Sequence, residues 1–237
     1  MHNVLADSTP LLRERLSQYR VVARQILAAR RHDEVRRFSF RIQSPDPALF
    51  GGYLRDTLLD ATPVDMDVQI FDARWIEPNG WRKLDAHDMA GLSGDSSFVV
   101  RLADYDYGLP FQNTVTSVGY YAVDGVDVPV NIVKAKTRMS VDEMLEAPDF
   151  GINQCLYYAN GTGHVMLSKP AEYDLAHKTM TWNAKRGLDE LARSKRRAER
   201  ITARLAAQGV HLTVDFSAAK ALERDALEND WLIGVMG

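Results

Sequence analysis

Hydrophobic and polar residues alternate strictly between Val64 and Phe71. The apolar positions of this segment are Val64, Met66, Val68 and Ile70. Successive side chains of a strand point to opposite faces, so the alternation predicts a strand with one buried apolar face. The other face carries Asp65 and Asp67. Two carboxylates on one strand face repel each other unless a cation lies between them, and such oxygen ligands suit Mg²⁺.

Apolar residues recur with a helical period near the N-terminus. Asp7 or Ser8 before Pro10 is a helix start signal, and the stripe continues to about Arg31. Its members are Leu12, Leu16, Tyr19, Ala23, Ile26 and Leu27. The pattern predicts one long N-terminal helix with a buried face.

Two further helices are predicted near the C-terminus. One covers residues 194–205 and ends at Gly209, and its buried stripe begins at Leu188. The other runs from Ser217 to Leu232. The apolar run 152–158, opened by Asp149 and Phe150, is also consistent with a capped core helix.

Three other segments read as strands. They are residues 38–42, 98–103 and 116–123. The dipeptide Asp124-Gly125 lies between the last of them and the apolar segment from Val126, which is a strong hairpin signal.

A pair of glycines precedes the aspartate strand. Gly51 and Gly52 open a short predicted helix that contains Leu54, Leu58 and Leu59. Glycine lets the backbone approach a ligand, and the N–H groups at a helix N-terminus attract phosphate. A phosphate cradle followed by a cation-binding strand is the combination that a nucleoside triphosphate requires.

These motifs resemble the head domain of the tRNA nucleotidyltransferases and bacterial poly(A) polymerases, a branch of the polymerase-β nucleotidyltransferases. The paired glycines, Arg55-Asp56, Pro63 and the Asp-x-Asp element stand in the family order. The segment 149–153, DFGIN, is similar to a second family motif, RRDFTIN. Ala147 and Pro148 replace its arginines, and Gly151 replaces its threonine. The resemblance covers about residues 45–205.

The resemblance implies an α/β fold of the α+β type, with a mixed, mostly antiparallel sheet. Residues 1–160 would form the head with its N-terminal helix, and residues 161–237 a helical neck-like extension. The implied reaction is template-independent transfer of a nucleoside monophosphate from an NTP to a hydroxyl, most simply an RNA 3′ end. It would use two Mg²⁺ ions and release pyrophosphate, as in tRNA processing.

The resemblance also assigns residues. Asp65 and Asp67 would bind metal and catalyse, while the Gly51 and Gly52 amides would hold the triphosphate. Three further nucleotide-binding candidates are Arg55, Asp149 and Asn153. For Arg55, a structural pairing with Asp56 is an equal alternative.

The family uses a third carboxylate from a neighbouring strand. Asn131 stands at that position by pattern, and an amide oxygen can ligate a metal without neutralising it. Asp127 lies two pleats away on the same predicted face and is the candidate third ligand if the register is shifted. Asp104 and Asp106 are other candidates, and the absence of a third carboxylate is the remaining alternative.

Composition limits the binding partners and the cellular compartment to be expected. The chain has 237 residues, 46% of them hydrophobic, and a net charge of −3, so nothing in its overall charge attracts nucleic acid. No apolar run reaches the roughly 18 residues of a membrane helix, and no signal peptide is visible. With Cys155 as the single cysteine, we expect a cytoplasmic protein that does not bind membranes.

Basic residues nevertheless cluster in segments 11–41 and 185–204. In the second segment, the candidate RNA-binding residues are Arg193, Arg196, Arg197 and Arg200. A solvated helix face explains such a run equally well. The function also has alternatives: a pseudoenzyme that binds nucleotide or RNA without chemistry, a transferase acting on a small molecule or protein, or an interaction module without nucleotide.

Overall fold

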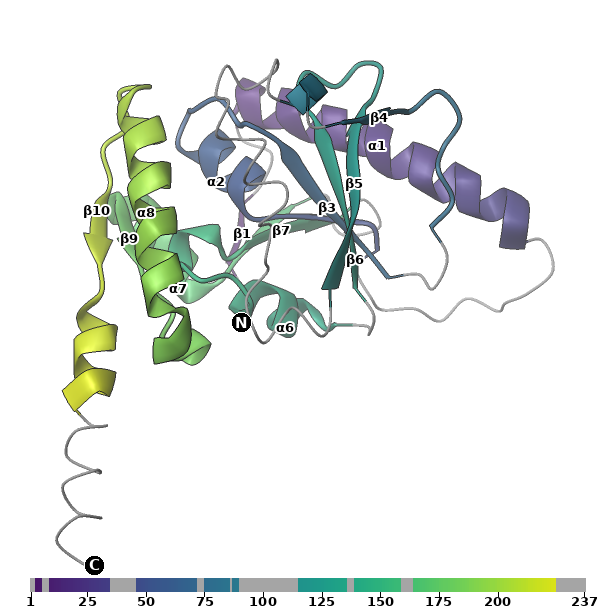
Figure 1. The fold of residues 1–237 in the computed structure, drawn as a ribbon. Helices are drawn as coiled ribbons and strands as arrows, with labels where there is room; N and C mark the ends of the chain where they lie inside the picture. Colours follow the sequence, from purple (N-terminus) through teal and green to yellow (C-terminus); the bar gives the residue numbers. More distant parts are fainter. Residues whose placement is uncertain are drawn as a thin grey trace, which may run out of the picture.

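A computed structural model shows one large sheet with helices on both faces and a helical region at one end (Figure 1). The structure describes residues 3–5, 9–34, 46–71, 75–85, 87–89, 115–135, 139–158 and 164–224. No helix in these ranges is long and apolar enough to span a bilayer.

The large sheet has eight strands in the order β1-β8-β7-β2-β3-β6-β5-β4. These are β1 (Asn3–Leu5), β2 (Ala48–Phe50), β3 (Met66–Ile70), β4 (Arg82–Leu84), β5 (Val115–Ala122), β6 (Val130–Ala135), β7 (Cys155–Tyr158) and β8 (Val165–Leu167). Only β3 and β6 pair in parallel among these neighbours, and the other pairs are antiparallel. The predicted mixed, mostly antiparallel sheet is therefore confirmed.

The remaining elements flank this sheet or form the end region. They are α1 (Pro10–Glu34), α2 (Gly52–Leu58), α6 (Val141–Glu146), η1 (Gly151–Asn153), α7 (Lys169–His177), β9 (Thr179–Thr181), η2 (Ala184–Arg186), η3 (Leu188–Glu190), α8 (Leu191–Ala206) and β10 (Thr213–Asp215). A last helical segment begins at Ser217 and is described to residue 224.

Strand alternation sorts the sheet into two faces. The apolar residues of β3 join the main core beneath α1 and α2, as do Val130 and Ile132 of β6. Ala48 and Leu156 point to the other face, where they pack against Met144 and Leu145 of α6. Asp67 alternates with the core residues of β3, so it faces away from α1.

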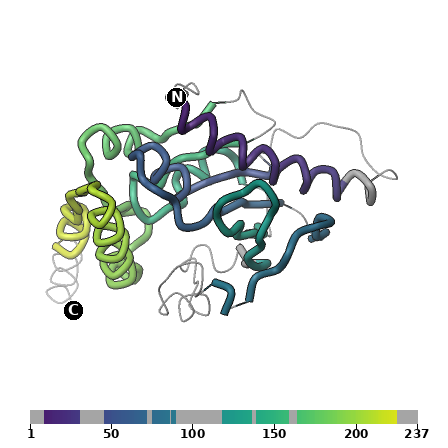
Figure 2. Tube along the Cα trace, turned by 90° about the horizontal axis from the view of Figure 1, so that it is seen from above, coloured from purple at the N-terminus to yellow at the C-terminus, as the bar shows by residue number. Residues whose placement is uncertain are grey.

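The long N-terminal helix is confirmed as α1, and its stripe is buried from Leu12 to Ile26. The helix begins at Pro10, and the Thr9 hydroxyl oxygen accepts a hydrogen bond from the Leu12 N–H, while Asp7 and Ser8 lie outside the described residues. α1 lies along one side of the sheet in both views (Figures 1 and 2).

The predicted hairpin is also confirmed. β5 and β6 pair antiparallel, and a turn at Asp124-Gly125 lies between them. The predicted strands 38–42 and 98–103, together with Asp104 and Asp106, lie outside the described residues.

The apolar run after Asn153 is a strand, and the helix predicted there is wrong. After the single turn η1, the chain enters β7 between β2 and β8. Cys155 and Tyr157 join the main core, whereas Leu156 points to the opposite face. A short apolar run that is buried on both faces has no hydrophobic periodicity that distinguishes a helix from a strand. Here the pairing with β2 and β8 makes it a strand.

The end region packs around α8. Its stripe Leu191, Ala198, Ile201 and Leu205 is buried as predicted, and the helix ends before Gly209. These residues contact Phe150, Ile152, Met180 and Trp182 in a second hydrophobic cluster. β9 and β10 form a small parallel sheet beside them. The boundary at residue 160 stays a prediction; β8, just beyond it, belongs to the large sheet.

The two regions join where η1 meets α7 and β9. Asp174 of α7 is fully buried, and its carboxylate accepts hydrogen bonds from the Thr179 hydroxyl at 2.7 Å and from the Thr181 hydroxyl at 2.7 Å and N–H at 3.0 Å. Gly151 lies against this carboxylate. A Cβ at Gly151 would stand 2.7 Å from the Asp174 Oδ2 and 2.9 Å from the Pro170 Cβ.

Gly151→Ala is expected to destabilise the fold by about 1–3 kcal/mol, because the held Asp174 carboxylate cannot move away from the new methyl group. Gly151→Thr, which restores the residue of the similar motif, should cost at least as much. Urea denaturation measures both. Ala176→Ser at an exposed position of α7 is the control, and a Gly151→Thr variant as stable as the parent would contradict the packing argument.

Candidate functional site

The carboxylate pair lies at the centre of the large sheet. Asp67 of β3 stands opposite Asn131 of the parallel strand β6, and Asn131 stands opposite Tyr120 of β5. The Asn131 Nδ2 donates a hydrogen bond to the Asp67 Oδ1 at 2.7 Å. The Tyr120 hydroxyl donates to the Asp65 Oδ2 at 3.3 Å. Each carboxylate therefore lies against a neutral donor.

The surroundings disfavour two negative charges here. Burial, and then the charge of Asp67, raise the pKa of Asp65 to about 8, although the Tyr120 hydrogen bond opposes the shift. Burial also raises the pKa of Asp67, and the Asn131 hydrogen bond and the positive charges of Arg197 and Arg55 act against it. Both carboxyl groups can be ionised at low free-energy cost only when a cation binds next to them.

The glycine turn leads into α2 beside this strand. Gly51 has φ +70° and ψ −129°, a conformation that favours glycine, and a Cβ there would meet nothing within 4 Å. The Gly51 N–H donates to the Cys155 carbonyl at 3.3 Å, which extends the pairing of β2 with β7. The predicted phosphate contacts of the Gly51 amide and of Gly52, the first residue of α2, stay predictions.

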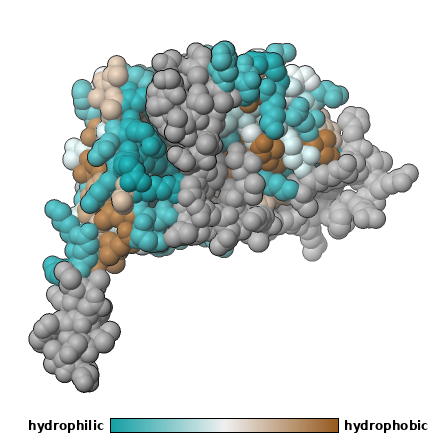
Figure 3. Space-filling view, viewed as in Figure 1, coloured by the Kyte–Doolittle hydropathy of each residue, from teal (hydrophilic) through white to brown (hydrophobic). Residues whose placement is uncertain are grey.

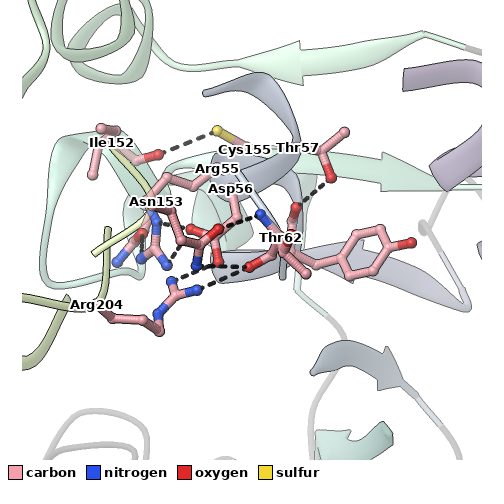
Figure 4. A network of polar contacts seen from close by, with 10 residues as sticks. Arg55, Asp56, Thr57, Thr62, Ile152, Asn153, Cys155 and Arg204 are labelled. Atoms are coloured by element: carbon pink, nitrogen blue, oxygen red, sulfur yellow. Dashed lines mark hydrogen bonds and ion pairs between the residues drawn. The ribbon is translucent and has the colours of Figure 1, made fainter. Parts of the chain in front are cut away.

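Arg55 is buried and makes structural contacts. Its Nε and Nη2 contact the Asp56 Oδ1 at 2.7 and 2.6 Å, and its Nη1 donates to the Asn153 Oδ1 at 2.8 Å (Figure 4). Of the two alternatives for Arg55, the structure shows the pairing with Asp56. The Asn153 Nδ2 is buried with no hydrogen-bond partner among the described residues, so it keeps a donor for a ligand.

The neck helix α8 brings several predicted residues together. Arg197 lies 3.3 Å from the buried Asp149 carboxylate, and Arg193 lies 3.4 Å from Glu190. Arg196 and Arg200 are exposed. Hydrophilic side chains cover this part of the molecule in Figure 3. Arg193 and Arg197 thus lie near carboxylates, Arg196 and Arg200 are exposed, and RNA binding stays a prediction.

The structure places Asp127 away from Asp67, and its role as a third ligand stays a prediction. It lies between the hairpin turn and β6, where its Oδ2 accepts a hydrogen bond from the Gln18 Nε2 of α1 at 2.5 Å. Its N–H donates to the Gln18 Oε1 at 3.3 Å. The unshifted register places Asn131, rather than Asp127, beside Asp67.

The donor set fits one divalent cation better than two. Within the described residues, no group of three His, Cys, Asp or Glu side chains is placed to hold a metal ion. Asp65 and Asp67 provide two carboxylates, which is the number that Mg²⁺ usually takes from a protein when substrate phosphates complete its shell. Burial and the charge of Asp67 raise the pKa of Asp65, and a bound cation would oppose that shift.

Sequence reasoning missed three residues of this region. Tyr120, Gln18 and Arg204 reach the site or its supports from distant segments, and only tertiary structure joins them to Asp65, Asp127 and Asp56. The Gly-Tyr-Tyr stretch of β5 carries no pattern that would have singled out Tyr120.

No family model matches the chain, and no curated protein matches it. Among solved structures, an apo CCA-adding enzyme matches with a TM-score of 0.50 and 18% identity over 97% of this chain and 47% of that one. A CCA-adding enzyme in complex with CTP matches with a TM-score of 0.50 and 17% identity, over 96% of this chain and 46% of that one. The Thermotoga maritima CCA-adding enzyme complexed with tRNA gives a TM-score of 0.46 and 15% identity, over 92% and 45%.

The chain therefore spans about half the length of these enzymes. At this level of identity the likeness shows the fold alone. That fold, a mixed and mostly antiparallel sheet with helices, is the one that the resemblance of the sequence motifs implied.

The pKa of Asp65 predicts how the metal-free protein responds to pH. Between its ordinary pKa of 3.8 and about 8, the folded protein keeps a proton that the unfolded chain has lost, so stability falls as pH rises through this window. Asp65→Asn removes the titration. It should be more stable than the parent by about 1–3 kcal/mol at pH 8, with little difference near pH 4.

Urea denaturation in EDTA at both pH values measures this difference. Asp124→Asn in the exposed hairpin turn is the control and should follow the parent. An Asp65→Asn advantage of the same size at both pH values would contradict the electrostatic explanation.

Proposed function

We propose that the chain is a template-independent nucleotidyltransferase that moves a nucleoside monophosphate from an NTP to a hydroxyl, with an RNA 3′ end as the acceptor. The observation that carries this proposal is the placement of two neighbouring carboxylates, Asp65 just before β3 and Asp67 within it, directly after α2 and its glycine turn. The nucleotidyltransferase fold supports it.

Each element has a defined part in this proposal. Asp65 and Asp67 would hold Mg²⁺, which supplies charge to stabilise the attacking and leaving oxygens. The Gly52 amide and the unpaired Asn153 Nδ2 would contact the nucleotide. The exposed Arg196 and Arg200 would contact the acceptor backbone, where each neutralised phosphate adds salt-sensitive affinity. Transfer then depends on position and electrostatics, with pyrophosphate as the leaving group.

A specific observation favours a second candidate. The side chain beside Asp67 on the neighbouring strand is the amide of Asn131. A carboxylate at this position would add negative charge to the pair and could accept a proton from an attacking hydroxyl, whereas an amide does neither. A nucleotide-binding protein without turnover is therefore the alternative function.

The proposal predicts pyrophosphate release from at least one of the four NTPs in the presence of Mg²⁺ and RNA, with lengthening of the RNA on a gel. Asp65→Asn and Asp67→Asn should each lower the rate by at least about 100-fold, because each removes charge from the cation site. Full activity in either variant would overturn the assignment. Saturable NTP binding without release would favour the nucleotide-binding alternative.

Asn131→Asp tests whether the amide at this position limits the rate of transfer. The new carboxylate would face Asp67 from the neighbouring strand, so turnover should rise about 10-fold or more if the missing charge limits transfer. In EDTA the same variant should lose thermal stability, and Mg²⁺ should restore it. Asn131→Ala, which removes the donor without adding charge, is the control. An Asn131→Asp protein with unchanged turnover and no Mg²⁺-dependent stability would show that this position does not serve the site.

A further inference from the structure

The neck helix makes direct contacts with the two segments that carry the proposed site. The guanidinium of Arg204 forks between them: its Nη2 donates to the Asp56 Oδ2 at 2.6 Å, and its Nη1 donates to the Thr62 carbonyl at 3.1 Å (Figure 4). Asp56 belongs to α2, which the glycine turn opens. Thr62 lies three residues before Asp65 on the loop from α2 to β3.

A second side chain at the end of α8 holds the same loop. The Gln208 Oε1 accepts a hydrogen bond from the Thr62 N–H at 2.7 Å. Both backbone polar groups of Thr62 are thus bound by side chains from the neck. Thr62 itself is exposed, so its position comes from these bonds rather than from burial.

The loop is also anchored at its other end. The Met66 N–H donates to the Pro129 carbonyl at 2.9 Å, where β3 begins to pair with β6. Asp65 therefore lies on a short segment fixed at Thr62 by the neck and at Met66 by the sheet. A loop held at both ends confines the Asp65 carboxylate more closely than the sheet alone would.

We propose that Arg204 and Gln208 are positioning residues of the nucleotidyl-transfer site, through which the neck fixes the distance between the glycine turn and Asp65. This inference rests on the proposed function. Arg204 acts through Asp56 and Thr62 and touches neither Asp65 nor Asp67 in the described contacts.

The contacts that remain after each substitution allow the variants to fold. Asp56 is buried, and in Arg204→Ala it keeps its contacts with Arg55 at 2.7 and 2.6 Å. Removal of Arg204 therefore does not leave an unpaired buried charge, and the variant is expected to fold. Gln208 is exposed and its truncation leaves Asp56 untouched.

The test compares Arg204→Ala, Arg204→Lys and Gln208→Ala with the parent in steady-state NTP turnover. Misplacement of a reacting group by about 1 Å can cost 100-fold, so Arg204→Ala should lower kcat about 10- to 100-fold with a change in KM below about 3-fold. Gln208→Ala should lower kcat less. Arg204→Lys keeps the charge near Asp65 but not the fork, so a kcat close to that of Arg204→Ala identifies geometry, rather than charge, as the cause.

Hydrogen exchange gives a readout that does not need activity. Amides of residues 61–66 should exchange at least about 10-fold faster in Arg204→Ala and Gln208→Ala, while those of β6 stay protected. Arg24→Ala, which removes an exposed arginine from α1, is the control and should change neither kcat nor exchange.

The outcomes separate the two proposals. If the parent protein turns over no NTP but exchange changes as expected, the proposed function fails. The contacts of Arg204 and Gln208 with Thr62 then remain as a structural feature only. If the parent is active and Arg204→Ala loses stability with an unchanged kcat, the positioning role is overturned. Unchanged exchange in residues 61–66 overturns it as well.

Discussion

The cost of ionising two neighbouring carboxylates, one buried and one half-buried, is the constraint on which the site depends. Asp65 and Asp67 stand one pleat apart, and burial disfavours the charge of each. The donors that lie against them, Tyr120 and Asn131, are neutral and orient the carboxylates without cancelling their charge. Metal-free protein therefore keeps a proton on Asp65 up to about pH 8, because burial and the charge of Asp67 raise the pKa of this carboxyl. Cation binding opposes that shift, which links stability to ligand binding.

In the described contacts, the nearby arginines pair with other carboxylates. Arg55 and Arg204 contact Asp56, and Arg197 contacts Asp149. Their fields favour the charged forms of the pair only from a distance. The arginines instead join α2, η1 and α8 into one polar network beside the site. The neck thereby becomes part of the support of the carboxylates, and a site that consists of head residues depends on a helix almost 140 residues further along the chain.

Local patterns predicted what local physics determines. The alternation from Val64 to Ile70 gave β3 and the shared face of the two aspartates, and Asp124-Gly125 gave the hairpin, because both signals act between near neighbours. The register of β6 against β3 is not local. Alternation put Asp127 and Asn131 on the same face, but β6 begins only at Val130, and Asp127 before it contacts Gln18 of α1, 109 residues away. The contact of Arg204 with Asp56 spans 148 residues and has no local signal.

The cost of the carboxylate pair bears on the choice between the functions. A purely structural role at this place would be served better by an amide at position 65, since a neutral side chain could accept the Tyr120 hydrogen bond without repelling Asp67. Asn131 shows that the fold accommodates an amide on the adjacent strand. Two adjacent acids gain an advantage only when a cation binds them, which also explains why the loop to Asp65 is held from both ends. The proposed cation-dependent binding of a phosphate ligand accounts for this pair of acids where an interaction module does not, and the proposal makes Asn131 the position at which binding and transfer are to be distinguished.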